Sequence, residues 1–98
     1  MSYTFASQGP RLVATQRRVI LSPAYRAVDG MLSSDIHDYW DDEDWRFVSY
    51  TARYDGRPAT AVFAVPHHDS TPESVRVAVV DETSGLTLYR PTVLATAG

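Results

Sequence analysis

The sequence predicts an α+β domain in which one main helix packs on a four- to five-stranded antiparallel sheet. Three observations predict this class: a hairpin pattern from Trp45 to Val65, helical spacing of apolar residues after Ser22, and short β-favouring runs at 75–80 and 86–89. With 98 residues, 44% of them hydrophobic, the chain is long enough for one core. We therefore expect residues 1–98 to form a single domain.

The hairpin is centred on Asp55-Gly56, which supplies the positive φ angles of a tight type I′ turn. A two-residue turn fixes the register, so Tyr54 faces Arg57 and the pairing continues to Arg46 opposite Val65. Side chains alternate along a strand, and one face of this hairpin is apolar. This predicted core face consists of Val48, Tyr50, Ala52, Ala59, Ala61 and Phe63. The other face is mixed, and we expect solvent or a partner to cover half of it.

The N-terminal part of the chain is ambiguous. Residues 1–10 end in Gly9-Pro10 and are expected to form a flexible arm or a short edge strand. Residues 11–21 allow a helix that groups Leu12, Gln16, Val19 and Ile20, but their apolar residues also alternate. The β-favouring run at 19–21 favours a strand over residues 16–21.

Ser22-Pro23 is a typical helix start, with Ser22 as N-cap and Pro23 at the first helical position. An apolar stripe with helical spacing follows and predicts the main helix. Its members are Ala24, Ala27, Val28, Met31, Leu32, Ile36 and Tyr39. Gly30 lies inside this stripe, so a break there, with Ser33 or Ser34 capping a second short helix, is an alternative. The acids at 41–44 would be unfavourable at a helix C-terminus, which predicts a loop.

After the hairpin, the pattern predicts a loop at 66–73, a strand at 75–80, a turn at 81–85 and a last strand from 86 that Pro91 ends. The resulting order of strand, helix and meander is similar to the cystatin-like arrangement in topology only. The Gln-x-Val-x-Gly hairpin motif of cystatins is missing from this sequence. The similarity therefore implies a shape and carries no function.

Composition excludes several kinds of chemistry. The chain has no cysteine, and all nine basic residues are arginines. Disulfides, thiolate metal sites and lysine Schiff bases are therefore excluded. No apolar run approaches the length of a membrane span, and the N-terminus lacks a leader pattern, so we expect a cytoplasmic protein without membrane contact.

Charge is unevenly distributed around a net value of −3. Residues 1–28 contain four arginines and no acid, whereas residues 29–44 contain seven acids and no base. Such asymmetry bears on partners rather than on fold. The arginines at 11, 17 and 18 lack interleaved aromatic residues, so we do not expect nucleic-acid binding and expect these arginines to pair with the acids.

The strongest candidate site is the acidic run flanked by two tryptophans. Aromatic anchors beside charges are typical of protein interfaces. We predict a partner-binding patch made of Trp40, Asp41, Asp42, Glu43, Asp44 and Trp45. A solvated acidic surface is the alternative. A further alternative is a cation site on a continued helix, with Asp38, Asp41 and Asp42 on one face. The sequence lacks the residue spacing of a calcium-binding loop, however.

A second cluster, His67-His68-Asp69-Ser70, contains residue types found in hydrolases and metal sites. Adjacent residues in a loop cannot supply the geometry of a catalytic triad among themselves. The Gly-x-Ser-x-Gly, His-Glu-x-x-His and phosphate-loop motifs are also missing from the sequence. We therefore expect an exposed loop here, and no catalytic residue, metal or cofactor.

The sequence as a whole predicts a small non-catalytic protein-binding module, regulatory or inhibitory, that acts through the acidic, aromatic-flanked patch. A homodimer formed through the sheet's edge or open face is the next expectation. The alternative is a small-molecule-binding protein or enzyme with a pocket between the helix and a curved sheet. Its polar lining would come from Tyr25, Asp29, His37, Tyr50 and Tyr54.

Overall fold

The computed structural model describes residues 9–91, apart from the side chains of residues 9–11, 34 and 35. Two short helices are followed by an antiparallel five-stranded sheet in which each strand pairs with its neighbour in the chain. The elements are α2 (Gly9–Ile20), α3 (Pro23–Val28), the 3₁₀ turn η1 (Asp29–Met31), β1 (Leu32–Asp41), β2 (Trp45–Tyr54), β3 (Arg57–Pro66), the 3₁₀ turn η2 (Pro72–Ser74), β4 (Arg76–Asp81) and β5 (Thr87–Tyr89). The predicted α+β class is confirmed. Residues 1–8 of the predicted arm lie outside the described part of the chain. Its last two residues, Gly9 and Pro10, belong to α2 instead.

The β2–β3 hairpin has the predicted register over its whole length, from Tyr54 opposite Arg57 to Arg46 opposite Val65. Asp55 and Gly56 have φ angles of 52° and 83°, as a type I′ turn requires. All six residues of the predicted core face are buried. The pattern of this hairpin therefore determines which face of the sheet carries the core.

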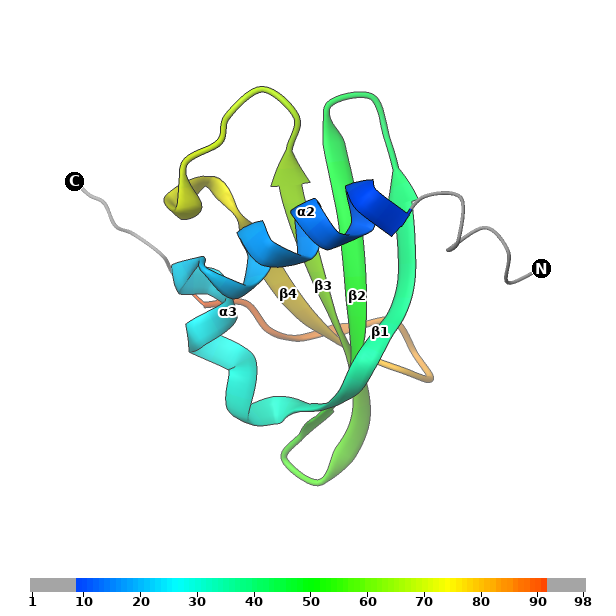
Figure 1. Ribbon diagram of the computed structural model, residues 1–98. Coiled ribbons are helices and arrows are strands. Elements are labelled where there is room, and N and C mark those ends of the chain that lie inside the picture. The colour runs from blue at the N-terminus through cyan, green and yellow to red at the C-terminus, as the bar shows by residue number, and fades with distance from the viewer. Residues whose placement is uncertain (1–8, 92–98) are drawn as a thin grey trace.

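The core lies between that face and the two helices (Figure 1). Val19 of α2 and Ala24 and Val28 of α3 belong to the same buried cluster as the sheet residues. β4 completes the cluster with Val77 and Val79. Both helices thus lie on one face of the sheet, and the opposite face has no helix over it among the described residues.

The predicted main helix is correct only at its start. The Ser22 hydroxyl accepts a hydrogen bond from the Tyr25 N–H at 3.2 Å, which confirms the N-cap. The helix ends at Val28, and residues 32–41 form β1, although the apolar stripe predicted a helix as far as Tyr39. The β1–β2 register shifts between Leu32 and Ile36 and again between Ile36 and Asp38. These irregularities insert extra residues into β1, so its apolar residues acquire the four- and three-residue spacing of a helix.

The predicted strand at 16–21 is also wrong, because residues 9–20 form α2. This helix buries Thr15 and Val19 and leaves Val13 and Ile20 exposed, and Leu21, which follows it, is exposed as well. Burial of one helical face outweighs the β propensity of Val19 and Ile20. The predicted cystatin-like order of strand, helix and meander is therefore replaced by two helices and a meander of five strands.

The C-terminal part of the meander agrees with the prediction. β4 ends at Asp81, and Gly85 adopts a left-handed φ of 78° in the turn before β5. The Gly85 N–H donates to the Asp81 carbonyl at 2.9 Å, which closes this turn. Tyr89 of β5 stacks on Tyr54 with ring centroids 5.9 Å apart, so the last strand packs back onto the β2–β3 hairpin.

Candidate protein-binding surface

The acidic run forms the turn of the β1–β2 hairpin rather than a loop after a helix, which corrects the prediction for residues 41–44. The Asp42 N–H donates to the Trp45 carbonyl at 2.8 Å, and the Asp42 carboxylate accepts from the Glu43 N–H at 2.7 Å. The His67 N–H donates to the Asp44 carbonyl at 3.0 Å, which ties the turn to the end of β3. All four acids are exposed, and these bonds fix the backbone that carries them.

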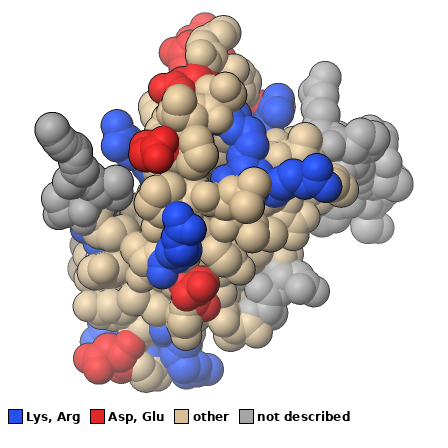
Figure 2. Space-filling model, turned by 60° about the vertical axis from the view of Figure 1, so that its left-hand side comes forward, with Lys and Arg blue, Asp and Glu red and all other residues tan. Residues whose placement is uncertain are grey.

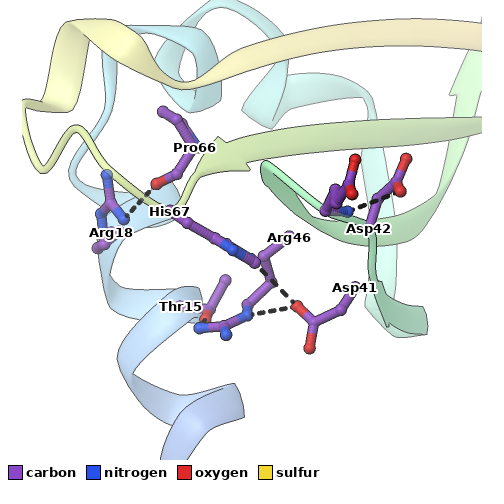
Figure 3. Close-up of polar contacts among 8 residues, drawn as sticks. Thr15, Arg18, Asp41, Asp42, Arg46, Pro66 and His67 are labelled. Carbon is purple, nitrogen blue, oxygen red and sulfur yellow. Dashed lines mark hydrogen bonds and ion pairs between the residues drawn. The ribbon is translucent and has the colours of Figure 1, made fainter.

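Asp41 lies on the helix side of the sheet, where it joins a polar cluster (Figure 3). Its carboxylate accepts from Arg46 Nε at 2.8 Å, and His67 Nε2 lies 3.4 Å from the same oxygen. Arg46 also donates to the Thr15 hydroxyl of α2 at 3.5 Å. We call Thr15, Asp41, Arg46 and His67 the clamp, because it joins the hairpin to α2 and to the end of β3.

The clamp holds the pKa of Asp41 below its ordinary value of 3.8. The main cause is the hydrogen bond from Arg46, opposed by desolvation, with the charge of Arg46 and the contact with His67 lowering the pKa further. The carboxylate of Asp41 is therefore paired with side chains of its own chain. Its role differs from that of Glu43 and Asp44 in the turn.

The two tryptophans lie on the opposite side of the sheet, which we call the open face. Trp40 stacks on Phe47, with ring centroids 5.1 Å apart and an interplanar angle of 17°. Trp40 is 41% exposed. Trp45 lies on the same face as Phe47, because the two residues are two positions apart in β2. The predicted patch is thus divided between two faces and a turn.

Cross-strand pairing arranges the open face in rows that run from β1 to β4. The first row consists of Trp40, Phe47, Ala64 and Arg76. The second row consists of Asp38, Ser49, Val62 and Ala78. Small side chains beside Phe47 leave a shallow hollow of about 490 Å³, lined by Trp45, Phe47, Val62, Ala64, Arg76, Val77, Ala78, Arg90 and Pro91.

Around the hollow, charge on the open face is separated between the two sides of the sheet. Asp38 stands on β1, and the turn acids follow at the end of that strand, whereas Arg76 and Arg90 border the hollow on the β4 and β5 side. Another side of the molecule carries both signs interspersed among uncharged residues (Figure 2). The acid-rich segment of the sequence thus forms β1, at one edge of the sheet, and the turn that follows it.

The other predicted candidates are distributed over separate places. His67 belongs to the clamp, while the Asp69 carboxylate accepts from the Thr71 N–H at 3.0 Å and from the Thr71 hydroxyl at 2.8 Å. The backbone hydrogen bond from Thr71 is the main cause that lowers the pKa of Asp69. These contacts give the loop a defined shape.

Among the described side chains of α2, Arg17 and Arg18 make no pair with the acidic run, contrary to the prediction. Arg18 donates to the Pro66 carbonyl at 3.1 Å and to the Asp69 carbonyl, so it fastens α2 to the end of β3. Arg17 is exposed, and the side chain of Arg11 lies outside the described residues. The arginine that pairs with the run is Arg46, which follows from the hairpin geometry that the sequence pattern did not reveal.

The residues predicted to line a pocket between helix and sheet also lie apart. The rings of Tyr25 and Tyr50 pack against each other and against Phe63, with centroid separations from 5.6 to 6.4 Å. Tyr54 stacks on Tyr89, and Asp29 and His37 are exposed. The predicted lining is therefore divided between a core cluster, a pair of rings at the sheet's end and the surface.

Within residues 9–91, no group of three or more histidine, aspartate and glutamate side chains converges as a metal site would require. In the same part of the chain, no helix has the length and apolar character needed to cross a bilayer. No protein-family model, no curated protein and no solved structure matches this sequence. A function can therefore be inferred only from the chain's own residues.

Proposed function

We propose that this chain is a non-catalytic protein-binding module whose contact surface is the open face of the sheet. The observation that carries the proposal is the exposed Trp40, which stacks on the half-buried Phe47 on a face over which no described helix lies. Clustered aromatic rings on a rigid sheet bury large apolar area at little conformational cost. They are the type of side chain that supplies most of the binding energy in protein interfaces.

The turn acids Glu43 and Asp44 stand at the margin of this surface. Charges at a margin contribute little affinity, but they orient an approaching partner and raise its association rate. The turn that carries them is fixed by hydrogen bonds to β2 and β3, so they are presented in a constant position relative to Trp45. We therefore assign the rings to affinity and the acids to orientation.

The test is affinity capture with two matched variants. Trp40→Ala together with Phe47→Ser removes the stacked pair. Val13→Ser together with Leu21→Ser removes exposed apolar side chains in and just after α2, which lie outside the open face. We expect the first variant to lose the proteins that wild type captures and the second to retain them. Equal capture by wild type and the open-face variant, with both shown folded by circular dichroism, would refute the proposal.

The hollow on the open face favours a second candidate function, the binding of a small molecule. Its volume of about 490 Å³ lies within the range of ligand sites, and Arg76 and Arg90 border an otherwise largely apolar lining. A ligand with an apolar body and a carboxylate or phosphate group would suit it. A panel of such compounds, titrated into the Trp40→Phe variant so that Trp45 of the lining is the fluorescent tryptophan, should then give saturable binding that Arg76→Gln weakens. An unresponsive panel would exclude this candidate.

A further inference from the structure

The open face is complementary to itself. Its first row contains, in order from β1 to β4, Trp40, Phe47, Ala64 and Arg76. Reversing that order places a cation opposite an indole and a small side chain opposite a large one. We propose that the occupant of the open face is a second copy of this chain, related by a two-fold axis that runs parallel to the strands between β2 and β3. This inference rests on the proposed function, because it names the partner of the same face.

Such an axis keeps each row at its own level while it reverses the order of the strands. β1 then faces β4 of the second copy, and β2 faces β3. Phe47 is placed against Ala64 of the second copy, so the large ring fills the hollow beside the small residue. The two sheets would stack about 10 Å apart with their strands roughly aligned, as in a β-sandwich. The shape of the face thus suits its own copy.

Charge complementarity selects this axis. Arg76 of one copy is brought over Trp40 of the other, where a guanidinium on an indole face makes a cation–π contact. Asp38, in the neighbouring row of β1, is brought close to that same Arg76. An axis perpendicular to the strands would instead place Arg76 against Arg76 if it passed through the first row, or Asp38 against Asp38 if it passed through the second. The like charges disfavour that alternative.

The first experiment is sedimentation equilibrium across a range of concentrations up to submillimolar. Wild type is expected to associate as a dimer, and Ala64→Arg, which places a charge beside the axis, is expected to be monomeric. Leu21→Arg is the matched control, because it adds the same side chain at an exposed position just after α2. A monomeric wild type, or an Ala64→Arg variant that still dimerises, overturns the inference.

The second experiment tests the axis by charge reversal. Asp38→Arg and Arg76→Asp are each expected to weaken the dimer about fivefold, the effect of an exposed ion pair. The double variant restores the ion pair but not the contact of Arg76 with Trp40, so it is expected to dimerise more tightly than either single variant and to recover most of the wild-type affinity. In one copy these residues are separated by β2 and β3, which is about 14 Å at the usual strand spacing. Recovery of dimer affinity in the double variant therefore indicates a contact between copies. A double variant that dimerises more weakly than both single variants overturns the proposed axis.

Failure of this inference and failure of the proposed function give different results. If wild type is monomeric but Trp40→Ala with Phe47→Ser still abolishes capture of another protein, the open face binds a different partner and only the second copy is refuted. If the dimer forms and Ala64→Arg leaves it intact, the dimer uses another surface. That outcome also refutes the inference, while the capture experiment still decides the proposed function.

Discussion

Replacing Tyr25 with alanine tests whether the space between α3 and the sheet is a filled core or a ligand pocket. The Tyr25 ring centroid lies 6.4 Å from that of Tyr50 and 6.0 Å from that of Phe63. Tyr25 itself is half-buried, whereas Phe63 is fully buried. Truncation at position 25 therefore removes two aromatic contacts and uncovers part of the core.

The expected cost follows from these contacts. Each aromatic pair contributes about 0.5–1.5 kcal/mol beyond the area that it buries. A fully buried ring costs about 3–5 kcal/mol on truncation to alanine, and a half-buried ring costs less. Tyr25→Ala is therefore expected to lower the free energy of unfolding by about 2–4 kcal/mol, a large part of the roughly 5–15 kcal/mol that stabilises a typical domain.

Urea unfolding monitored by tryptophan fluorescence measures this change, because both tryptophans lie on the β1–β2 hairpin. For a slope of about 1.5 kcal/mol per molar urea, the midpoint should fall by about 2 M. Tyr25→Phe is the matched control, since it keeps the ring contacts and should lose less than about 1 kcal/mol. A loss below about 1 kcal/mol for Tyr25→Ala would refute the filled core and favour a pocket at this place.

Three further perturbations test the local interactions of the fold by the same measurement. Gly56→Ala should destabilise the hairpin by about 1–2 kcal/mol because φ is +83° there, whereas Gly30→Ala, whose added Cβ meets nothing within 4 Å, should stay within about 0.5 kcal/mol. Ser22→Ala should lower the free energy of unfolding by about 1–2 kcal/mol, because it removes the N-cap of α3. Ser22→Thr keeps a capping hydroxyl, so a Ser22→Thr variant as unstable as Ser22→Ala would contradict the cap. Asp41→Asn should cost up to about 1 kcal/mol at neutral pH. Because the folded pKa of Asp41 is lowered, that contribution is complete above pH 3.8 and disappears as the pH falls through the folded value, so a difference that persists in acid would exclude the pair with Arg46.

The β2–β3 hairpin could be predicted residue by residue because its determinants are local. Asp55-Gly56 sets the turn, the two-residue loop sets the register, and the alternation of side chains then sets the face. The N-cap at Ser22 and the turn at Gly85 were predictable for the same reason. Each depends on a few adjacent residues rather than on packing.

β1 was not predictable in this way, because its determinants are not local. Leu32, Ile36 and Tyr39 have helical spacing, and β1 places them toward the core only because its register with β2 shifts twice. A bulge depends on the partner strand, which the spacing of one segment does not reveal. A turn signal was present nevertheless: four consecutive acids between two tryptophans fit a hairpin connection better than the end of a helix.

The same error explains why the predicted patch is divided in the structure. On a helix or in a loop, six consecutive residues from Trp40 to Trp45 can form one surface, but strand alternation sends neighbours to opposite faces. Asp41 therefore joins Arg46 and His67 on the helix side, while both tryptophans join Phe47 on the open face. The clamp and Arg18 hold α2 on its side of the sheet, so the binding that we propose for the open face would not require its displacement.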